Sequence, residues 1–371
     1  MTALISKMRT EVEKNGTLSF ARFMEMALYD PKDGYYERHR HIGKSGDFYT
    51  SISVGSLFGE LLAFQFAEWF EKRGAQNAER GKVNLQIIEA GAHDGKMAVD
   101  ILDWFKTHCP EIFSRLEYCI LEPSPLRREW QRKLLAEFSD KISWAGDWSD
   151  FPRSAFPLPR FQIVFSNELF DAMPAHRLGW DAKDKRWFEW GVDWNGESFV
   201  WKHLPKIPVE FLLPQIAPEL LEVLPDGFTT EICPSAMRWW TEAAQNLGNG
   251  KIIAIDYGLL AEQFFVPERS NGTLRAFFQH HASSDLLARP GEQDLTAHVN
   301  FSALKNAGEI AGLKTDALIS QTKFLIGIAE QSWARQNQFS EWDASRRKQF
   351  QTLTHPEHLG RAFRVLIQSR G

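Results

Sequence analysis

The sequence has few cysteines and no long hydrophobic run, and both absences limit what the protein can be. Its 371 residues include three cysteines, Cys109, Cys119 and Cys233, which are too few and too scattered for a disulfide framework or a zinc site. No apolar run approaches the roughly 20 residues that a membrane-spanning helix needs. We therefore expect a protein of a reducing compartment that does not span a membrane.

An excess of basic residues and an N-terminal apolar segment are also missing. The formal net charge is −5 and no basic stripe dominates, which argues against nucleic acid as a main partner. Residues 1–16 mix acids and bases without an apolar core, so they do not resemble a secretory signal, and their acids are unusual in a mitochondrial transit peptide. These features favour the cytoplasm, or the mitochondrial matrix if the organism is eukaryotic.

Metal-ligand patterns are absent too, whereas aromatic residues are abundant. The histidine pairs at 39 and 41 and at 280 and 281 lack carboxylate or cysteine partners at helical spacing, so we expect no metal site. The 14 tryptophans and 28 phenylalanines fit a large aromatic core, and an aromatic groove for an extended ligand is the alternative.

The order of the predicted elements is typical of an α/β protein. Strands alternate with helices from residue 83 onwards, and we predict strands over 85–89, 117–122, 141–145, 161–166 and 251–257. This alternation predicts a mostly parallel, Rossmann-like sheet with helices on both faces. We assign residues 1–80 to an N-terminal helical extension, 81–330 to the core and 331–371 to a C-terminal helical tail.

Two stretches interrupt the alternation. Residues 179–231 contain two aromatic, strand-like segments around Asn195-Gly196, a strong hairpin signal, so we predict an inserted β-hairpin lobe there. Residues 258–299 carry no clear period and are predicted to form a long polar loop. Loops of this length inside a compact domain are usually functional.

Residues 85–102 carry the strongest functional signal of the chain. An apolar strand ends at Glu89, turns through Gly91 and Gly95 and leads into an amphipathic helix, with His93 between the glycines. Glycines let the backbone approach a ligand closely, and the helix N-terminus adds a positive dipole end. The spacing is not the G-x-G-x-x-G of dehydrogenases.

Acidic residues at later strand ends narrow the class of ligand. Glu122 closes the second strand, where a carboxylate can accept hydrogen bonds from both hydroxyls of a ribose. Asn167, Glu168 and Asp171 follow the fourth strand, at the edge of the sheet where chemistry collects; capping of the next helix is the alternative. The pattern favours an S-adenosylmethionine-dependent methyltransferase, with NAD or another nucleotide as the alternative cofactor.

Together these segments resemble the MidA family of class I S-adenosylmethionine-dependent methyltransferases. The resemblance covers residues 18–328, and the segment 290–301 is its most specific part. The other matching motifs are Asp30-Pro31, Gly34-Tyr35-Tyr36, Gly46-Asp47-Phe48, Thr50-Ser51, Phe58-Gly59-Glu60, Glu89-Ala90-Gly91, Glu122-Pro123-Ser124-Pro125, Asn167-Glu168, Asp171-Ala172, Ile255-Asp256-Tyr257-Gly258 and Gly272-Thr273-Leu274-Arg275.

The resemblance implies S-adenosylmethionine as the cofactor and arginine on a protein as the acceptor. The candidate cofactor-binding residues are Gly46, Asp47, Phe48, Thr50, Ser51, Glu89, Gly91, His93, Gly95, Glu122, Pro123, Asp147, Asn167 and Glu168. The candidate catalytic residues are Glu168, Asn167, Asp171 and His298.

For these candidates we expect particular roles. Glu168, with Asp171 or Glu231 as a second acid, would hold the guanidinium in a bidentate fork, because that group is always charged. His298 would be a general base or would orient the acceptor. The chain departs from the family pattern at His93, where glycine is usual, and at Asn300, where aspartate is usual.

Two other functions remain open at this point. A small-molecule methyltransferase would use the aromatic insert to shape its pocket. An assembly factor of respiratory complexes would keep the cofactor fold without requiring turnover. Exposed aromatic residues on the insert would serve a partner protein or the interface of a homodimer.

Overall fold

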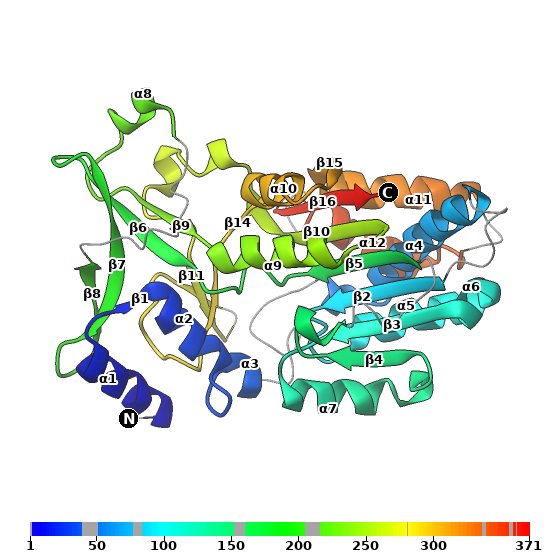
Figure 1. Ribbon diagram of the computed structural model, residues 1–371, viewed down its shortest axis with the longest axis horizontal. Coiled ribbons are helices and arrows are strands. Elements are labelled where there is room, and N and C mark those ends of the chain that lie inside the picture. Colours follow the sequence, from blue (N-terminus) through cyan, green and yellow to red (C-terminus); the bar gives the residue numbers. More distant parts are fainter. Residues whose placement is uncertain are drawn as a thin grey trace. The chain divides into compact units, whose positions relative to one another are not determined.

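The computed structural model describes residues 2–38, 51–76, 84–151, 160–204, 216–279, 281–335, 339–355, 359–360 and 362–371. The chain forms two compact units (Figure 1). The core unit comprises Tyr49–Leu169, Trp239–Gly258 and Leu304–Gly371. The insert unit comprises Met1–Phe48, Phe170–Arg238 and Leu259–Ala303.

The core unit is built on a mostly parallel sheet with the strand order β15-β16-β10-β5-β2-β3-β4. The strands from β10 to β4 are parallel to their neighbours, and β16 is antiparallel to both β10 and β15. Strand order reverses at β2, which lies between β3 and β5, so the carboxyl ends of β2 and β5 flank a topological switch point. The strands are β2 (Asn84–Ala90), β3 (Leu116–Leu121), β4 (Ile142–Ala145), β5 (Arg160–Asn167), β10 (Gly250–Leu259), β15 (Lys314–Ser320) and β16 (Phe363–Arg370).

Helices cover both faces of this sheet. Ile367 of β16 belongs to the apolar cluster that contains α4 (Leu57–Gln76) and α5 (Lys96–His108), whereas the next residue, Gln368, accepts a hydrogen bond from Trp240 of α9 (Pro234–Asn246). Consecutive strand residues point to opposite faces, so α4 and α9 lie on different sides. The other core helices are α6 (Pro110–Arg115), α7 (Pro125–Leu134), α10 (Phe301–Ile310), α11 (Gln321–Ala334) and α12 (Ala344–Thr354).

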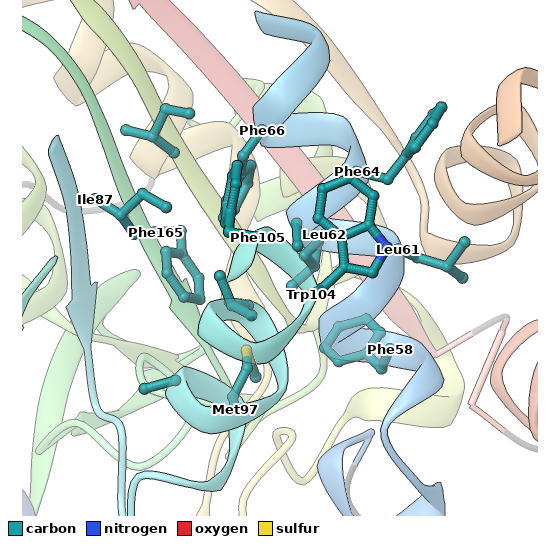
Figure 2. Packing of buried hydrophobic residues seen from close by; sticks show 14 of the residues in the cluster. Phe58, Leu61, Leu62, Phe64, Phe66, Ile87, Met97, Trp104, Phe105 and Phe165 are labelled. Atoms are coloured by element: carbon teal, nitrogen blue, oxygen red, sulfur yellow. The ribbon is translucent and has the colours of Figure 1, made fainter. Parts of the chain in front are cut away.

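The main apolar core lies between α4, α5 and the sheet. Figure 2 shows Phe66 of α4 facing Phe165 of β5, and the two ring centroids are 5.3 Å apart. Trp104 of α5 meets Phe64 of α4 edge-to-face at 6.0 Å. These fully or nearly buried rings account for part of the high aromatic content. They also hold α5 in position against α4, and α5 begins directly after the glycine turn.

The insert unit is organised around an antiparallel sheet. Its order is β1-β7-β6-β9, and β8 pairs with β7. The strands are β1 (Leu18–Ser19), β6 (His176–Asp181), β7 (Arg186–Trp194), β8 (Phe199–Leu204) and β9 (Thr229–Ile232). Helices α1 (Ala3–Asn15), α2 (Phe20–Tyr29) and α3 (Tyr35–Arg38) belong to the same unit, and Phe20 of α2 packs on Trp201 with 5.2 Å between rings.

Most predicted elements are confirmed, and the α/β fold class with them. The five predicted core strands lie within two residues of their expected bounds, and β7 and β8 form the predicted hairpin around Asn195-Gly196. The hairpin is part of a larger sheet that takes β1 from the N-terminal segment. The predicted N-terminal extension is therefore not a single unit, because α1 to α3 join the insert unit while α4 joins the core unit.

Two predictions about the later chain are wrong. Residues 331–371 are not a helical tail, because β16 pairs with β10 and β15 inside the core sheet. Its buried run of Val365, Leu366 and Ile367 has no alternation, since both faces are covered, and periodicity cannot identify such a strand. Residues 258–299 are not a plain loop either: they contain the short antiparallel strands β11 (Arg275–Phe278), β12 (His281–Ser283) and β13 (Asp294–Thr296).

Among the described helices, none has both the length and the apolar character that crossing a bilayer requires.

The core between α4 and the sheet predicts a large difference between two leucine truncations. Leu62 is fully buried and Leu134 is 48% exposed. Leu62→Ala should lower the free energy of unfolding by about 2–5 kcal/mol, and Leu134→Ala should change it by less than about 0.5 kcal/mol. Urea unfolding of both variants measures this. Equal losses would contradict the packing described here.

Candidate active site

The turn after β2 is shaped by residues with left-handed backbone conformations. Gly91, His93 and Gly95 have φ values of 76°, 48° and 92°. A Cβ on Gly91 would lie 3.0 Å from Cδ1 of Leu169, the second residue after β5. The missing side chain therefore lets the β2 turn pack closely against the end of β5, and α5 then begins at Lys96 with its N-terminus at this edge.

Glu89 is a buried carboxylic acid just before this turn. It is 2% exposed, and the hydroxyl of Tyr118 on β3 donates to its Oε2 at 2.6 Å. The pKa of Glu89 is raised to about 8, mainly by burial and in part by Asp94 and Asp100, against the opposing effect of the Tyr118 hydrogen bond. A group of this kind at the site of a cationic ligand can change its protonation state on binding.

Glu122 follows β3 and is held by the start of α7. Its Oε1 accepts a hydrogen bond from the backbone N–H of Ser124 at 2.9 Å and lies 3.1 Å from Nε of Arg127. Ser124 also caps α7, because its Oγ accepts from the N–H of Arg127 at 3.2 Å. The carboxylate is 1% exposed and has a defined orientation at the carboxyl edge of the sheet.

Asn167 and Glu168 bring a second carboxylate to the same edge. Oε1 of Glu168 accepts from the backbone N–H of Ser51 and from Nδ2 of Asn167, each at 3.0 Å. Glu168 has a φ of 52°, an unfavourable value for a residue with a side chain. Such strain clusters at functional sites, where the surrounding structure must maintain it.

Asp256 in the second half of β10 maintains that conformation. Its Oδ2 accepts from the N–H of Leu169 at 3.1 Å, and the N–H of Glu168 donates to the carbonyl of Ile255 at 2.9 Å. Sequence reasoning placed Asp256 at a strand end but did not connect it with Glu168. An aspartate directly after the apolar run 252–255 was the available signal, and the structure shows that it is fully buried.

Three other sequence candidates belong to the insert unit. The carbonyl of Asp171 accepts from the N–H of Ala297 at 2.8 Å, so the chain after Phe170 is joined to the segment that carries His298. The pKa of His298 is lowered to about 4, mainly by burial and in part by the positive charges of Arg269 and Arg275. The imidazole is therefore neutral at pH 7.

Glu231 is also buried in the insert unit. Its Oε2 accepts from the N–H and the hydroxyl of Thr273 at 2.7 and 2.9 Å, and Gly272 leaves room for its Oε1. Burial raises the pKa of Glu231, against the effect of these hydrogen bonds.

Six sequence candidates remain, and the structure describes two of them, Pro123 and Asp147. Gly46, Asp47, Phe48 and Thr50 lie outside the described residues. Pro123 is exposed next to Glu122. Asp147 caps the short helix after β4 by accepting from the N–H of Ser149 at 2.7 Å. Within the described ranges, no group of three or more His, Cys, Asp or Glu residues could hold a metal ion.

The core unit offers groups that suit a nucleoside-containing cofactor. Oδ1 of Asn167 and Oγ of Ser51 are buried and meet no hydrogen-bond partner among the described residues. Asn167 is the last residue of β5, and Ser51 reaches the same edge through its hydrogen bond to Glu168, next to Leu169, which packs against Gly91. Buried polar atoms of this kind are expected where a ligand completes the hydrogen bonding.

Comparison with known proteins identifies the chemistry. The family of S-adenosyl-L-methionine-dependent methyltransferases matches residues 61–319, more than half of the chain. The chain belongs to this family. This methyltransferase is 28% identical over 340 residues to the mitochondrial protein arginine methyltransferase NDUFAF7 of Rattus norvegicus, covering 84% of the chain and 72% of the relative. The Mus musculus protein of the same name is 26% identical and covers 98% and 83%.

A solved structure supports the same cofactor. A protein from Burkholderia thailandensis with bound S-adenosyl-homocysteine superimposes on the methyltransferase with a TM-score of 0.78 and 28% identity, covering 99% of this chain and 92% of that one. The predicted class I fold, the methyltransferase activity and S-adenosylmethionine as the cofactor are confirmed.

The buried acid Glu89 predicts a pH-dependent stability. The folded protein keeps a proton on Glu89 up to a pH of about 8, whereas the unfolded chain loses it near the ordinary pKa of 4.5. The stabilisation from the protonated Glu89 is therefore fully present below pH 4.5 and is lost as the pH rises from 4.5 to about 8. Glu89→Gln cannot lose the proton, so its stability relative to the parent should increase from pH 5 to pH 8 in urea unfolding. A constant difference would contradict the raised pKa.

The left-handed conformation of His93 predicts that glycine is tolerated there. His93→Gly should change the free energy of unfolding by less than about 1 kcal/mol, because relief of strain offsets the larger backbone entropy of glycine. His93→Val should destabilise more, since a β-branched residue strongly disfavours positive φ. Thermal unfolding of the two variants gives the comparison, and equal stability would be the contrary result.

Proposed function

We propose that the methyltransferase transfers a methyl group to an arginine side chain of a protein. The relatives described above are named protein arginine methyltransferases. The observation that carries the proposal is the carboxylate of Glu168, which two N–H donors orient at the carboxyl end of β5. A guanidinium needs such a partner because it stays charged at all physiological pH values.

Glu168 would act on the acceptor by orientation and charge. Ser51 and Asn167 both donate to Oε1, so the plane of the carboxylate is restrained before an acceptor arrives. A bidentate pair would then hold the guanidinium in one plane and leave one nitrogen directed at the transferred group. When bound, S-adenosylmethionine supplies a methyl group activated by its sulfonium sulfur. Correct placement accounts for much of the rate of such a displacement.

Further residues complete the proposal. Asp171 follows Glu168 by three residues and is our first choice for the second acid. Glu231 is the alternative, and its Oε2 accepts two hydrogen bonds from Thr273, as Oε1 of Glu168 does from Ser51 and Asn167. We assign His298 to orienting the acceptor, because its lowered pKa of about 4 makes it a poor base at neutral pH.

Cofactor contacts form a separate part of the proposal. We assign Gly91, Gly95 and Glu89 to the methionine side of S-adenosylmethionine and Glu122 to its ribose hydroxyls. Buried and unsatisfied atoms of Ser51 and Asn167 support their place in this set. His93 contributes through its backbone in this assignment. Gly46, Asp47, Phe48, Thr50, Pro123 and Asp147 remain predictions from the family resemblance.

The acceptor class and the compartment are proposed from the relatives and the cysteines. A protein acceptor agrees with the names of the relatives. We propose the cytoplasm, or the mitochondrial matrix in a eukaryote. The free thiols of Cys109, Cys119 and Cys233 agree with a reducing compartment, and the mitochondrial relatives support the matrix in the eukaryotic case.

Replacing Glu168 tests the central role. Glu168→Gln keeps the shape and removes the charge that the guanidinium needs, so methyl transfer should fall about a hundredfold or more. The dissociation constant for S-adenosyl-homocysteine should change little, as measured by calorimetry. Glu129→Gln on the exposed face of α7 is the matched control and should keep both properties. Normal turnover in Glu168→Gln would refute the assignment.

The acceptor itself can be identified with tritiated S-adenosylmethionine in an extract of the source cells. Label in protein, recovered as methylarginine after hydrolysis, is the result that we expect. Label in small molecules alone would favour the small-molecule methyltransferase. Restoration of the cellular phenotype by a Glu168→Gln protein that binds cofactor but does not transfer would favour the assembly factor.

A further inference from the structure

Gln131 is a fully buried polar residue on a strongly polar helix. Helix α7 also carries three arginines, a glutamate and a lysine. Gln131 is the buried residue of this helix and has no exposed surface. A buried amide without hydrogen-bond partners destabilises the folded state. Its hydrogen bonds therefore indicate why the amide is placed there.

The amide of Gln131 connects two parts of the candidate cofactor site. Its Nε2 donates to the carbonyl of His93 at 2.9 Å and to Oε2 of Glu122 at 3.4 Å. His93 lies in the turn after β2, and Glu122 follows β3. One side chain thus contacts both the glycine turn and the carboxylate assigned to the ribose.

Trp144 determines which end of the amide faces the site. The indole Nε1 of Trp144 on β4 donates to Oε1 of Gln131 at 2.9 Å. An indole N–H can only donate, so the oxygen of the amide must face Trp144. The NH₂ group is then directed at His93 and Glu122, and a rotated amide would lose these contacts.

Packing places Gln131 against the glycine turn as well. A Cβ on Gly95 would lie 3.4 Å from Cγ of Gln131 and 3.0 Å from Cδ1 of Leu135. The absence of a side chain at Gly95 thus lets α7 approach the turn. Figure 1 shows α7 beside β4, in agreement with the Trp144 contact.

We propose that Gln131 is a positioning residue for the cofactor, because it sets the distance between the glycine turn and Glu122. It holds the left-handed conformation of His93 through the backbone carbonyl, so the position tolerates a residue other than glycine. It also directs Oε2 of Glu122, while Ser124 and Arg127 hold Oε1. The inference rests on the cofactor role proposed for Glu122 and does not depend on the identity of the acceptor.

Gln131→Met tests the proposal, since methionine keeps the length of the side chain and removes both hydrogen-bonding groups. The dissociation constant for S-adenosyl-homocysteine should rise about three- to tenfold, the value of one or two hydrogen bonds. The KM for S-adenosylmethionine should rise in parallel, with kcat nearly unchanged at saturation.

Gln368 provides a matched control within the core unit. It is also a fully buried glutamine, its Oε1 accepts from the indole of Trp240 at 2.7 Å, and its Nε2 donates to the carbonyl of Lys305 at 2.9 Å. Gln368→Met should reduce stability in a similar way without changing the affinity for S-adenosyl-homocysteine. Comparing the two variants separates positioning from a general loss of stability.

A second variant covers the case in which Gln131→Met does not fold. Trp144→Phe leaves Gln131 in place and removes the donor that orients its amide, so it should weaken cofactor binding in the same direction but less. Equal affinities in Gln131→Met and Gln368→Met, or unchanged affinity in Trp144→Phe when the first does not fold, would overturn the role of Gln131.

Glu122→Gln distinguishes this failure from a failure of the proposed site. If Glu122→Gln weakens binding and Gln131→Met does not, the role of Gln131 alone is wrong. If Glu122→Gln leaves the affinity unchanged, the ribose assignment is wrong, and the positioning role of Gln131 falls with it.

Discussion

The close approach of two turns at the carboxyl edge of the core sheet is the constraint on which the candidate site depends. Gly91 in the turn after β2 packs against Leu169 after β5, and a side chain on Gly91 would come within 3.0 Å of it. Because β2 and β5 are parallel neighbours, their carboxyl ends lie at the same edge of the sheet. The strand order reverses at β2, so the segments that follow β2 and β5 lead to opposite sides of this point. A larger residue at Gly91 would be strained at its φ of 76° and would crowd the side chain of Leu169, the residue after Glu168.

This packing forces the backbone into conformations that the surroundings must stabilise. Glu168 and His93 both have positive φ values. The carbonyl of Ile255 and the carboxylate of Asp256 hold the first turn, and the amide of Gln131 holds the second. Each of these partners comes from a distant part of the chain. The geometry of the site therefore depends on the folded sheet and not on the local sequence of either turn.

Burial of carboxyl groups is the second energetic cost of the site. Glu89, Glu122 and Asp256 are each at most 2% exposed, and each has a specific hydrogen-bond donor. Glu89 has the raised pKa that desolvation produces, while Glu122 lies beside the permanently charged Arg127. Two carboxyl groups at neighbouring strand ends are thus in different environments, which suits contacts with different parts of one ligand.

Local patterns in the sequence determined the α/β class, the core strands, the hairpin at Asn195-Gly196 and the acids at the strand ends, because periodicity and turn chemistry are short-range properties. The family motifs added the cofactor. Only the tertiary structure decided that β16 enters the sheet, since a strand covered on both faces has no alternation. It alone joined β1 to β7, Asp256 to the turn at Glu168, and Gln131 to His93. These contacts connect residues 38 to 174 positions apart, and no local pattern records such pairings.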